Sequence, residues 1–336
     1  MNSFIPKEYV SALGIYDTQK AIALLKRLFV DRLAAELNLF RVSAPLFVQN
    51  NTGINDDLNG FERPVSFDIA NTEKRAEVVQ SLAKWKRLAL NRYNFYPGKG
   101  IYTDMNAIRR DEEMDNLHSV YVDQWDWEKV IEEKDRNVEY LINTAESIVK
   151  ALCDTQSTMQ SIYPQLGRYG ELRRSLAVIT SQELEDLYPD LSPKDRENVF
   201  AEKHGSVFIM QIGDVLRSGI PHDGRAPDYD DWKLNGDILF WYEPLGYAME
   251  ISSMGIRVDP ETLDLQLKKS GCEDRRELMY HKKLLSGELP LTIGGGIGQS
   301  RLSILVLDKV HIGEVQASIW DEQTIEVCNS AGVMLL

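Results

Sequence analysis

The chain has 336 residues, of which 43% are hydrophobic, and 52 acidic against 38 basic residues give it a formal net charge of −14. This length suits one large domain, or one domain with an insertion. No apolar run approaches the roughly 18 residues of a membrane helix, so the sequence excludes a helical membrane span. The acidic balance lowers the expectation of a nucleic-acid-binding protein without excluding one.

Targeting and redox features point to the cytoplasm. The first eight residues lack a basic segment followed by an apolar one, so we expect no secretory signal. Cys153, Cys272 and Cys328 are odd in number, far apart and without a CxxC pair. The sequence therefore predicts a protein of the reducing cytoplasm with no membrane partner.

The opening 40 residues predict one long amphipathic helix, because apolar residues recur at three- and four-residue spacing after an N-cap at Asp17 or Thr18. Residues 42–48 are typical of a strand, in which Pro45 suits an edge or an interface. Residues 49–60 are rich in Asn, Asp and Gly and indicate a loop. Apolar spacing predicts a second long helix over about residues 128–152.

Between about residues 155 and 205 we expect an insertion of short helices. Thr180 and Glu183 can form a capping box, and Ser192-Pro193 favours a helix start. The later expected elements are a buried strand over 206–212, strands near 236–243 and 247–258, a helix over about 273–286, and a glycine run at 294–298 that leads into an apolar helix.

Strands that alternate with helices and have hairpin-like neighbours predict an α+β fold. We expect an antiparallel sheet of about six to eight strands flanked by helices. No repeat or two-domain linker divides the sequence, so residues 1–336 should form a single domain.

The most informative segment is the predicted hairpin of residues 108–128. Its first strand ends at Arg109, an acidic turn follows, and the return strand alternates polar with bulky apolar side chains. Alternate residues of a strand point to opposite faces, so the acidic and amide groups share one face. One face carries Val122, Gln124, Asp126 and Glu128, and the other carries Tyr121, Asp123, Trp125 and Trp127. This pattern predicts a polar pocket floor beside an arginine that suits a phosphate or a carboxylate.

Four segments in order resemble the core of the class II aminoacyl-tRNA synthetases, and of the aspartyl and asparaginyl enzymes in particular. They are residues 80–87, the hairpin of 109–128, the strands around 235–237 and 250–257, and the glycine run of 294–301. The resemblance implies the antiparallel class II fold. It also implies a homodimer, with Pro45 at the position of the interface proline of motif 1.

Five runs resemble one family of that superfamily more closely, the ammonia-dependent asparagine synthetases or aspartate–ammonia ligases. They are residues 81–87, 118–128, 226–232, 252–257 and 292–302, and the likeness extends essentially end to end. It implies a single catalytic domain that makes L-asparagine from L-aspartate, ATP and ammonia. The implied route is a β-aspartyl-adenylate, with AMP and pyrophosphate as products, Mg²⁺ as cofactor and no tRNA.

The resemblance also implies roles in ATP activation. The attacking carboxylate and the α-phosphate are both negative, so Arg109 would lie between them. Asp237 and Glu250 would supply oxygen ligands to Mg²⁺, and Asp237 would also contact ATP. Arg301 would lie flat on adenine, and Gly295 would border the nucleotide.

Aspartate selection requires partners for the second carboxylate and for the amino group. Lys86 and Arg257 would hold the carboxylate that does not react. Asp126 and Gln124 would bind the ammonium group and the reacting acyl group, so Gln124 counts as catalytic with Arg109. The other expected substrate contacts are Ser81, Asp123, Ser252 and Ser253.

Ammonia exists mostly as ammonium at neutral pH and must lose a proton before it attacks. A loop carboxylate can attract the cation and take the proton, and we assign this catalytic role to Asp56, with Asp57 as the alternative. Asn2 follows Met1, and no cysteine stands near the proposed pocket, so free ammonia is favoured over glutamine as nitrogen source.

Two alternatives stay open. One is a truncated aspartyl- or asparaginyl-tRNA synthetase paralogue that acts on RNA, and the other is a non-catalytic class II paralogue that serves as a binding partner. The acidic balance and the expected lack of an anticodon-binding barrel speak against the first. Retention of the arginines and carboxylates proposed for ATP speaks against the second. Val122 replaces the phenylalanine that stacks on adenine in motif 2, which leaves one face of adenine without a partner.

Overall fold

A large sheet forms the centre of the computed structural model, which describes residues 3–56, 58 and 62–336. In this part of the chain, eight strands pair in the order β1-β5-β6-β11-β10-β9-β8-β7. Their bounds are Leu39–Arg41 (β1), Gly100–Ile108 (β5), Tyr121–Val130 (β6), Thr292–Gly298 (β11), Tyr247–Arg257 (β10), Asp230–Tyr242 (β9), Ser206–Met210 (β8) and Ala177–Thr180 (β7). Only the edge pairs β1–β5 and β7–β8 are parallel. The predicted α+β class with an antiparallel sheet is confirmed.

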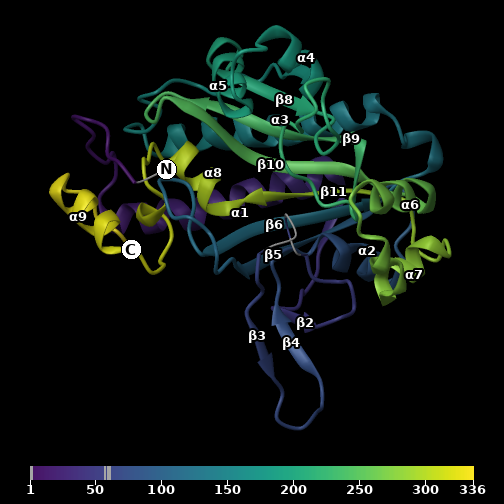
Figure 1. Ribbon diagram of the computed structural model, residues 1–336. Coiled ribbons are helices and arrows are strands. Elements are labelled where there is room, and N and C mark those ends of the chain that lie inside the picture. Colours follow the sequence, from purple (N-terminus) through teal and green to yellow (C-terminus); the bar gives the residue numbers. More distant parts are fainter. Residues whose placement is uncertain (1–2, 57, 59–61) are drawn as a thin grey trace.

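Helices cover both faces of this sheet (Figure 1). One face packs against α1 (Ile15–Leu37), α3 (Val138–Ile162) and α8 (Gln299–Val306) in the main hydrophobic core. On the other face, α4 (Ser181–Leu187) and α5 (Pro193–His204) cover the β8 end, and α2 (Ala83–Arg92) lies over β6. The remaining helical elements are α6 (Pro260–Lys269), α7 (Met279–Leu285), α9 (Glu322–Ser330) and the 3-10 helices Glu133–Asp135, Glu273–Glu277 and Ile312–Glu314.

The aromatic face of β6 explains why α1 packs where it does. Trp125 and Trp127 are at most 2% exposed, and Phe29 of α1 packs on Trp125 with ring centroids 5.0 Å apart. Burying such large side chains supplies much of the hydrophobic free energy of a core. The opposite, polar face of β6 is thereby left for the cavity described below.

A smaller sheet projects from the body of the molecule (Figure 1). It has the order β2-β4-β3, with bounds Phe47–Gln49 (β2), Arg75–Val78 (β4) and Ser66–Asp68 (β3). The predicted loop of residues 49–60 leaves this sheet after β2. Asp57 and the end of that loop lie outside the described residues.

Several predicted boundaries were wrong. The first helix begins at Ile15 with Gly14 as N-cap, not Asp17 or Thr18. Of the predicted strand of 42–48, only Phe47 and Val48 belong to a strand, β2, and residues 42–46 connect β1 with β2, where Pro45 cannot donate to a ladder. The predicted helix of 128–152 starts ten residues later, at Val138, because β6 continues to Val130.

The glycine run leads into a helix as expected, α8, and residues 294–298 themselves form part of strand β11, for which no secondary structure had been predicted. A further helix, α6, was missed between β10 and the predicted helix of 273–286. Within that predicted helix, only Met279–Leu285 is α-helical.

The segment of residues 155–205 contains more than short helices. Its first residues complete α3, and Ala177–Thr180 forms β7, which pairs with β8 at the edge of the main sheet. The predicted capping box of Thr180 with Glu183 is present, and so is the Ser192 cap of α5. Among the helices of the described residues, none is long and apolar enough to cross a membrane.

Candidate active site

A cavity of about 550 Å³ lies over the polar face of the sheet, within the size range of small-molecule sites. β6, β10 and β11 supply its floor, and loops supply its walls. The predicted site residues that line it are Asp56, Ser81, Lys86, Arg109, Asp123, Gln124, Asp126, Glu250, Ser253, Arg257, Gly295 and Arg301. Asp237 and Ser252 are buried and do not line it directly.

The glycines of β11 make room for the polar side chains of β6. Gly294 pairs with Glu128, and Gly296 pairs with Asp126. A Cβ atom on Gly294 would stand 2.0 Å from Oε2 of Glu128, and one on Gly296 would stand 2.5 Å from Oε1 of Gln124. The strand therefore needs glycine at these positions, which explains why a strand of the floor contains a run of glycines.

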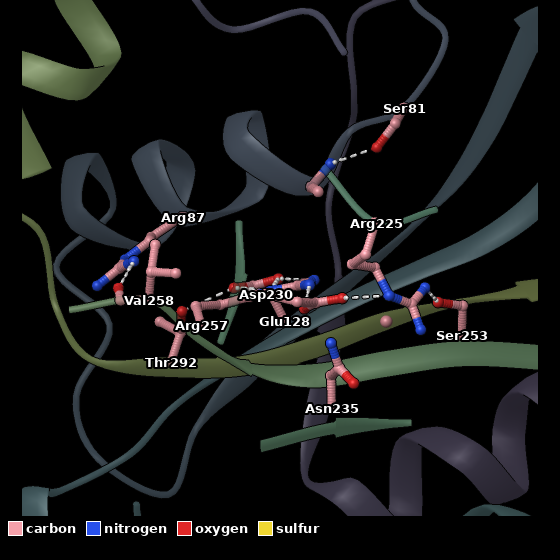
Figure 2. A network of polar contacts seen from close by, with 12 residues as sticks. Ser81, Arg87, Glu128, Arg225, Asp230, Asn235, Ser253, Arg257, Val258 and Thr292 are labelled. Atoms are coloured by element: carbon pink, nitrogen blue, oxygen red, sulfur yellow. Dashed lines mark hydrogen bonds and ion pairs between the residues drawn. The ribbon is translucent and has the colours of Figure 1, made fainter. Parts of the chain in front are cut away.

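A buried ion network lies at the centre of the floor (Figure 2). Arg257 donates from Nε to Oε1 of Glu128 at 3.0 Å and from Nη2 to Oε2 at 2.8 Å, and Nη1 donates to Asp230. Thr292 donates to Glu128 at 2.7 Å. Burial alone would raise the pKa of Glu128, but the charge of Arg257 and its hydrogen bonds reverse this and lower it.

Lys86 extends the network from α2. Its Nζ lies 3.2 Å from Oδ2 of Asp126, 3.9 Å from Oε2 of Glu128, and donates to the carbonyl of Gly295 at 3.0 Å. The side chain is 1% exposed, and this burial lowers the pKa of Lys86 although both carboxylates oppose the shift. The predicted pair Lys86 and Arg257 is thus brought together with Asp126 at one point of the cavity.

Arg225 is a cavity residue to which the sequence analysis assigned no role. It donates from Nη1 to Oγ of Ser253 (Figure 2). Its Nη2 donates to Oδ1 of Asp237 at 2.7 Å. Arg225 directly precedes the run of residues 226–232, which supported the family resemblance. That position was the available signal, but only the fold brings Arg225 to the predicted metal ligand.

Asp237 and Glu250 are diagonal neighbours on β9 and β10, since Glu250 pairs with Leu239. Burial raises the pKa of Asp237 to about 7, with Arg225 opposing the shift and Glu250 and Asp223 adding to it. A divalent cation bound between carboxylates reduces the electrostatic repulsion between them. The described residues hold no group of three or more metal-ligating side chains. The pair therefore fits Mg²⁺ held by one or two carboxylates together with substrate phosphates, and not a cage made wholly of protein.

Two arginines line the cavity away from the floor. Arg109 follows β5, is about one quarter exposed, and its closest described ion partner is Glu112 at 4.0 Å. Arg301 donates from Nη1 to the carbonyl of Glu250 at 3.2 Å, and its Nη2 lies 2.7 Å from Nε2 of His118. Both guanidinium groups border the space in which a ligand would lie.

His118 orients Arg301, a role that the sequence did not indicate. Burial alone would raise the pKa of Asp115, but hydrogen bonds from the His118 ring and from backbone amides lower it to about 2. Asp115 is then ionised at neutral pH and accepts from Nδ1 of His118 at 2.8 Å. This fixes the tautomer in which Nε2 accepts from Arg301.

Asp123 projects from the tryptophan side of β6 towards α8. It accepts from Oγ of Ser300 at 2.6 Å and from Nζ of Lys26 at 3.0 Å, and it also borders the cavity. Asp56 is 3% exposed and lines the cavity from the loop that follows β2. Ser81, two residues before the first residue of α2, accepts from the amide of Ala83 at 3.1 Å (Figure 2).

The sheet order and the cavity floor define a class II aminoacyl-tRNA synthetase-like protein. Two asparaginyl-tRNA synthetases share its fold. The one from Entamoeba histolytica matches with a TM-score of 0.65 and 13% sequence identity, over 90% of this chain and 66% of its own. The one from Pyrococcus horikoshii matches with a TM-score of 0.64 and 16% sequence identity, over 91% of this chain and 70% of its own. Both were solved with asparaginyl-adenylate. The chain spans about two thirds of the length of these synthetases.

The particular family follows from the sequence. The family model described as aspartate-ammonia ligase matches residues 16–332. Aspartate–ammonia ligases from Lactobacillus johnsonii and Ruminiclostridium cellulolyticum are each 56% identical over 338 aligned residues, which cover 100% of both chains. The one from Fusobacterium nucleatum is 56% identical over 98% of this chain and 99% of its own. The chain belongs to the aspartate–ammonia ligase family, enzymes of asparagine synthesis.

The crowding at Gly294 gives a test of the ion network. Gly294→Ala would push the new methyl group into the Glu128–Arg257 pair, 2.0 Å from Oε2 and 2.6 Å from Nη2. Since breaking a buried ion pair costs about 3–5 kcal/mol, we expect the free energy of unfolding to fall by a comparable amount. Urea unfolding followed by fluorescence measures this. Gly14→Ala, which meets nothing within 4 Å, is the control, and equal midpoints for the two variants would contradict the expectation.

Proposed function

We propose that this enzyme makes L-asparagine in two steps within one cavity. ATP first activates the β-carboxylate of L-aspartate as an aspartyl-adenylate with release of pyrophosphate, and ammonia then displaces AMP. The observation that carries the proposal is that a single cavity contains both the charged floor and the two arginines, Arg109 and Arg301. The asparaginyl-adenylate bound by synthetases of the same fold supports an adenylate in this position.

Arg109 is proposed to stabilise the activation step. Two anions, the β-carboxylate and the α-phosphate, must approach one another, and a fork-shaped cation can contact both. Its guanidinium lines the cavity and is a quarter exposed, and within the described residues its ion partner is Glu112 at 4.0 Å. It can therefore turn towards the developing pentacoordinate phosphate without breaking a buried contact, which suits a group that acts in the transition state.

Arg301 and Gly295 are proposed to hold the nucleotide. Because His118 and the carbonyl of Glu250 fix the guanidinium plane of Arg301, it can serve as a preformed platform for adenine. Asp237 and Glu250 would hold Mg²⁺ against the phosphates. The ion would supply positive charge to the polyphosphate when bound.

Aspartate recognition is proposed for the floor. Lys86 and Arg257 would face the carboxylate that does not react, and Asp126 and Gln124 would face the ammonium group and the acyl group. Arg257 already binds two carboxylates, so its share of positive charge for a ligand is smaller than that of an uncommitted arginine. Lys86 is likewise paired, with Asp126 and Glu128, so each cation would share its charge between the carboxylates of the floor and the ligand. Ser81, Ser252, Ser253 and Asp123 are proposed as supporting contacts.

Asp56 is proposed as the carboxylate that receives ammonia. It is almost fully buried and lines the main cavity, so it can hold a small cation next to the adenylate. We further propose that the enzyme acts in the cytoplasm without tRNA. The net charge of −14 and the full-length identity to the ligases support this over an RNA-dependent paralogue. The co-occurrence of Arg109, Arg301, Asp237 and Glu250 around the proposed nucleotide site supports catalysis over a purely binding role.

A homodimer is proposed from the surface around β1 and β2. Phe40, Leu46 and Phe47 are 45–54% exposed and flank Pro45, and clustered exposed apolar side chains commonly mark an interface.

The reaction is tested by product analysis. Purified enzyme with ATP, Mg²⁺ and aspartate should release AMP and form asparagine only when ammonium is added, and tRNA should make no difference. Anion-exchange chromatography separates AMP from ADP. ADP as the product, or a strict requirement for tRNA, would overturn the proposal.

Two arginine variants separate activation from recognition. Arg109→Ala should lower kcat about 100- to 1000-fold with little change in the KM for aspartate, because its charge acts mainly in the transition state. Arg257→Lys keeps the charge that balances Glu128 and Asp230 but loses the fork, so it should chiefly raise the KM for aspartate. Arg110→Ala, at an exposed neighbouring position, is the control. An unchanged aspartate KM in the Arg257 variant would remove it from the substrate clamp.

The dimer is tested by sedimentation. The wild-type enzyme should sediment as a dimer, and Leu46→Asp should shift it towards monomer because a charge placed in an apolar interface loses its hydration. Ile319→Asp changes an equally apolar but 80% exposed residue outside this surface and should leave the dimer intact. A monomeric wild-type enzyme at micromolar concentration would contradict the proposal.

A further inference from the structure

A second cavity, of about 200 Å³, lies behind the wall that carries Asp56. Asp56 lines both cavities, and among the described residues no other side chain does. The second cavity lies between the loop that follows β2, the start of α2 and the start of α7. The charged or titratable residues that line it are Asp56, Glu77, Lys84, Asp228, Arg275 and His281. Of these, only Asp56 has a role in the function proposed above.

Asp228 is the centre of this cluster. It is 0% exposed, and its Oδ2 accepts from Nζ of Lys84 at 3.1 Å, Nη1 of Arg275 at 2.9 Å and Nε2 of His281 at 2.9 Å. Burial alone would raise the pKa of Asp228, but the Lys84 charge, the His281 hydrogen bond and the Arg275 charge lower it well below its usual value. Asp228 is therefore a carboxylate at neutral pH and accepts the hydrogen bond from Nε2 of His281. Neutral His281 then carries its lone pair on Nδ1.

Nδ1 of His281 has no hydrogen-bond partner within the described part of the chain, although the side chain is 0% exposed. A buried acceptor that accepts nothing costs about 1–3 kcal/mol, so the arrangement needs a reason. Gly53 keeps the atom uncovered, because a Cβ at that position would stand 2.7 Å from Nδ1. The uncovered nitrogen is thus an acceptor prepared for a small ligand that donates a hydrogen bond.

The two walls of the cavity carry opposite charge. Glu77 and Asp56 lie on the side of the small sheet and its loop, and they attract a cation. Lys84 and Arg275 lie with His281 on the other side, and nearby positive charge favours the neutral form of a bound amine. A cation that enters along the acidic wall therefore meets a base in a setting that promotes loss of its proton.

We propose that this cavity is the entry site for ammonium and that the Asp228–His281 pair takes its first proton. The inference rests on the proposed function. Conversion of NH₄⁺ to an amide removes two protons from the nitrogen. His281 Nδ1 accepts the first, which gives NH₃ and an imidazolium stabilised by Asp228. The imidazolium later returns this proton to water in the cavity.

The neutral NH₃ then passes Asp56 into the main cavity. Its nitrogen forms a bond to the acyl carbon, the bond from that carbon to the AMP oxygen breaks, and Asp56 takes the second proton. Atoms and charge balance with asparagine, AMP and two protons as products. Two bases in series explain why a carboxylate and an imidazole both stand on the route of one small substrate.

His281→Gln tests the proposal, because the glutamine amide can still donate to Asp228 but cannot act as a base. At pH 7 the kcat/KM for ammonium should fall about 100-fold, the ordinary contribution of a general base. Aspartate-dependent exchange of pyrophosphate into ATP should stay unchanged, since adenylate formation does not need ammonium. His204→Gln, on the opposite side of the molecule in α5, is the matched control.

Hydroxylamine provides the decisive comparison. It is already neutral at pH 7 and can attack the adenylate without losing a proton first, so His281→Gln should form aspartyl hydroxamate at nearly the wild-type rate. Raising the pH should partly restore ammonium use by supplying NH₃. The charged groups that contact His281 or line the cavity with it are Asp228, Lys84, Arg275, Asp56 and Glu77, and the Tyr280 ring lies 5.4 Å away. Equal losses with ammonium and hydroxylamine would overturn the role as a base.

A plug at the cavity tests the route even if the His281 variant does not fold. Leu278→Trp adds bulk to a half-buried lining residue, whereas Met279→Trp adds it to the exposed neighbour that lines neither cavity. Only the first should lower kcat/KM for ammonium while pyrophosphate exchange persists. If both variants behave alike, the cavity is not the route. If the wild type shows no pyrophosphate exchange, the adenylate proposal fails independently of this inference.

Discussion

The buried pairing of Arg257 with Glu128 and Asp230 is the constraint on which the centre of the molecule depends. Each of these side chains is at most 3% exposed. An unpaired charge at such depth costs several kcal/mol, so the three residues have to meet with good geometry. They come from β6, β9 and β10, and Lys86 adds α2. The register of these strands and the position of α2 therefore both depend on the requirement that these buried charges be paired. The glycines of β11 follow from the same constraint, because any side chain at Gly294 would occupy the space of the ion pair.

The same network gives the cavity a rigid floor and leaves adaptability to its walls. Substrate-facing groups on paired strands are held by ladders and by ion pairs, which reduces the reorganisation needed when charge develops. The walls differ. Arg109 follows the end of a strand, Arg225 lies in a loop, and Asp56 lies in the loop after β2. The proposed recognition of aspartate suits the rigid floor. The proposed activation by ATP and entry of ammonia instead involve wall residues whose contacts change during the reaction. The division matches the general placement of functional residues on loops above a rigid scaffold.

The sequence indicated the floor because it depends on strand periodicity alone. Alternation in residues 121–128 predicted the tryptophans in the core, which is confirmed, and Gln124 and Asp126 line the cavity as expected. Asp123 of the tryptophan face also borders the cavity, whereas Glu128 is buried in the ion network and does not line it. The glycine run was not recognised as a strand because glycine is a poor strand former, and only the side chains of the neighbouring strand show why it is needed there. Arg225 and His118 could not be assigned from spacing, since their partners Asp237 and Arg301 lie 12 and 183 residues away. Such roles are fixed by tertiary contacts, which local patterns do not contain.

In the proposed reaction, the order in which the substrates enter accounts for two cavities that meet at one carboxylate. An acyl-adenylate is sensitive to water, so a site that holds ATP and aspartate benefits from being filled and closed during activation. Ammonia is then the last reactant, and it would have to pass bound nucleotide if it used the same opening. A passage that reaches the acyl group from behind Asp56 avoids this conflict. It would also separate two opposite electrostatic demands, because the cations proposed for the phosphates, Arg109 and Arg301, line the main cavity, whereas the anions proposed to attract ammonium, Glu77 and Asp56, line the second one. With buried Asp56 between the two cavities, each cavity would keep its own electrostatic potential while neutral NH₃ passes from one to the other.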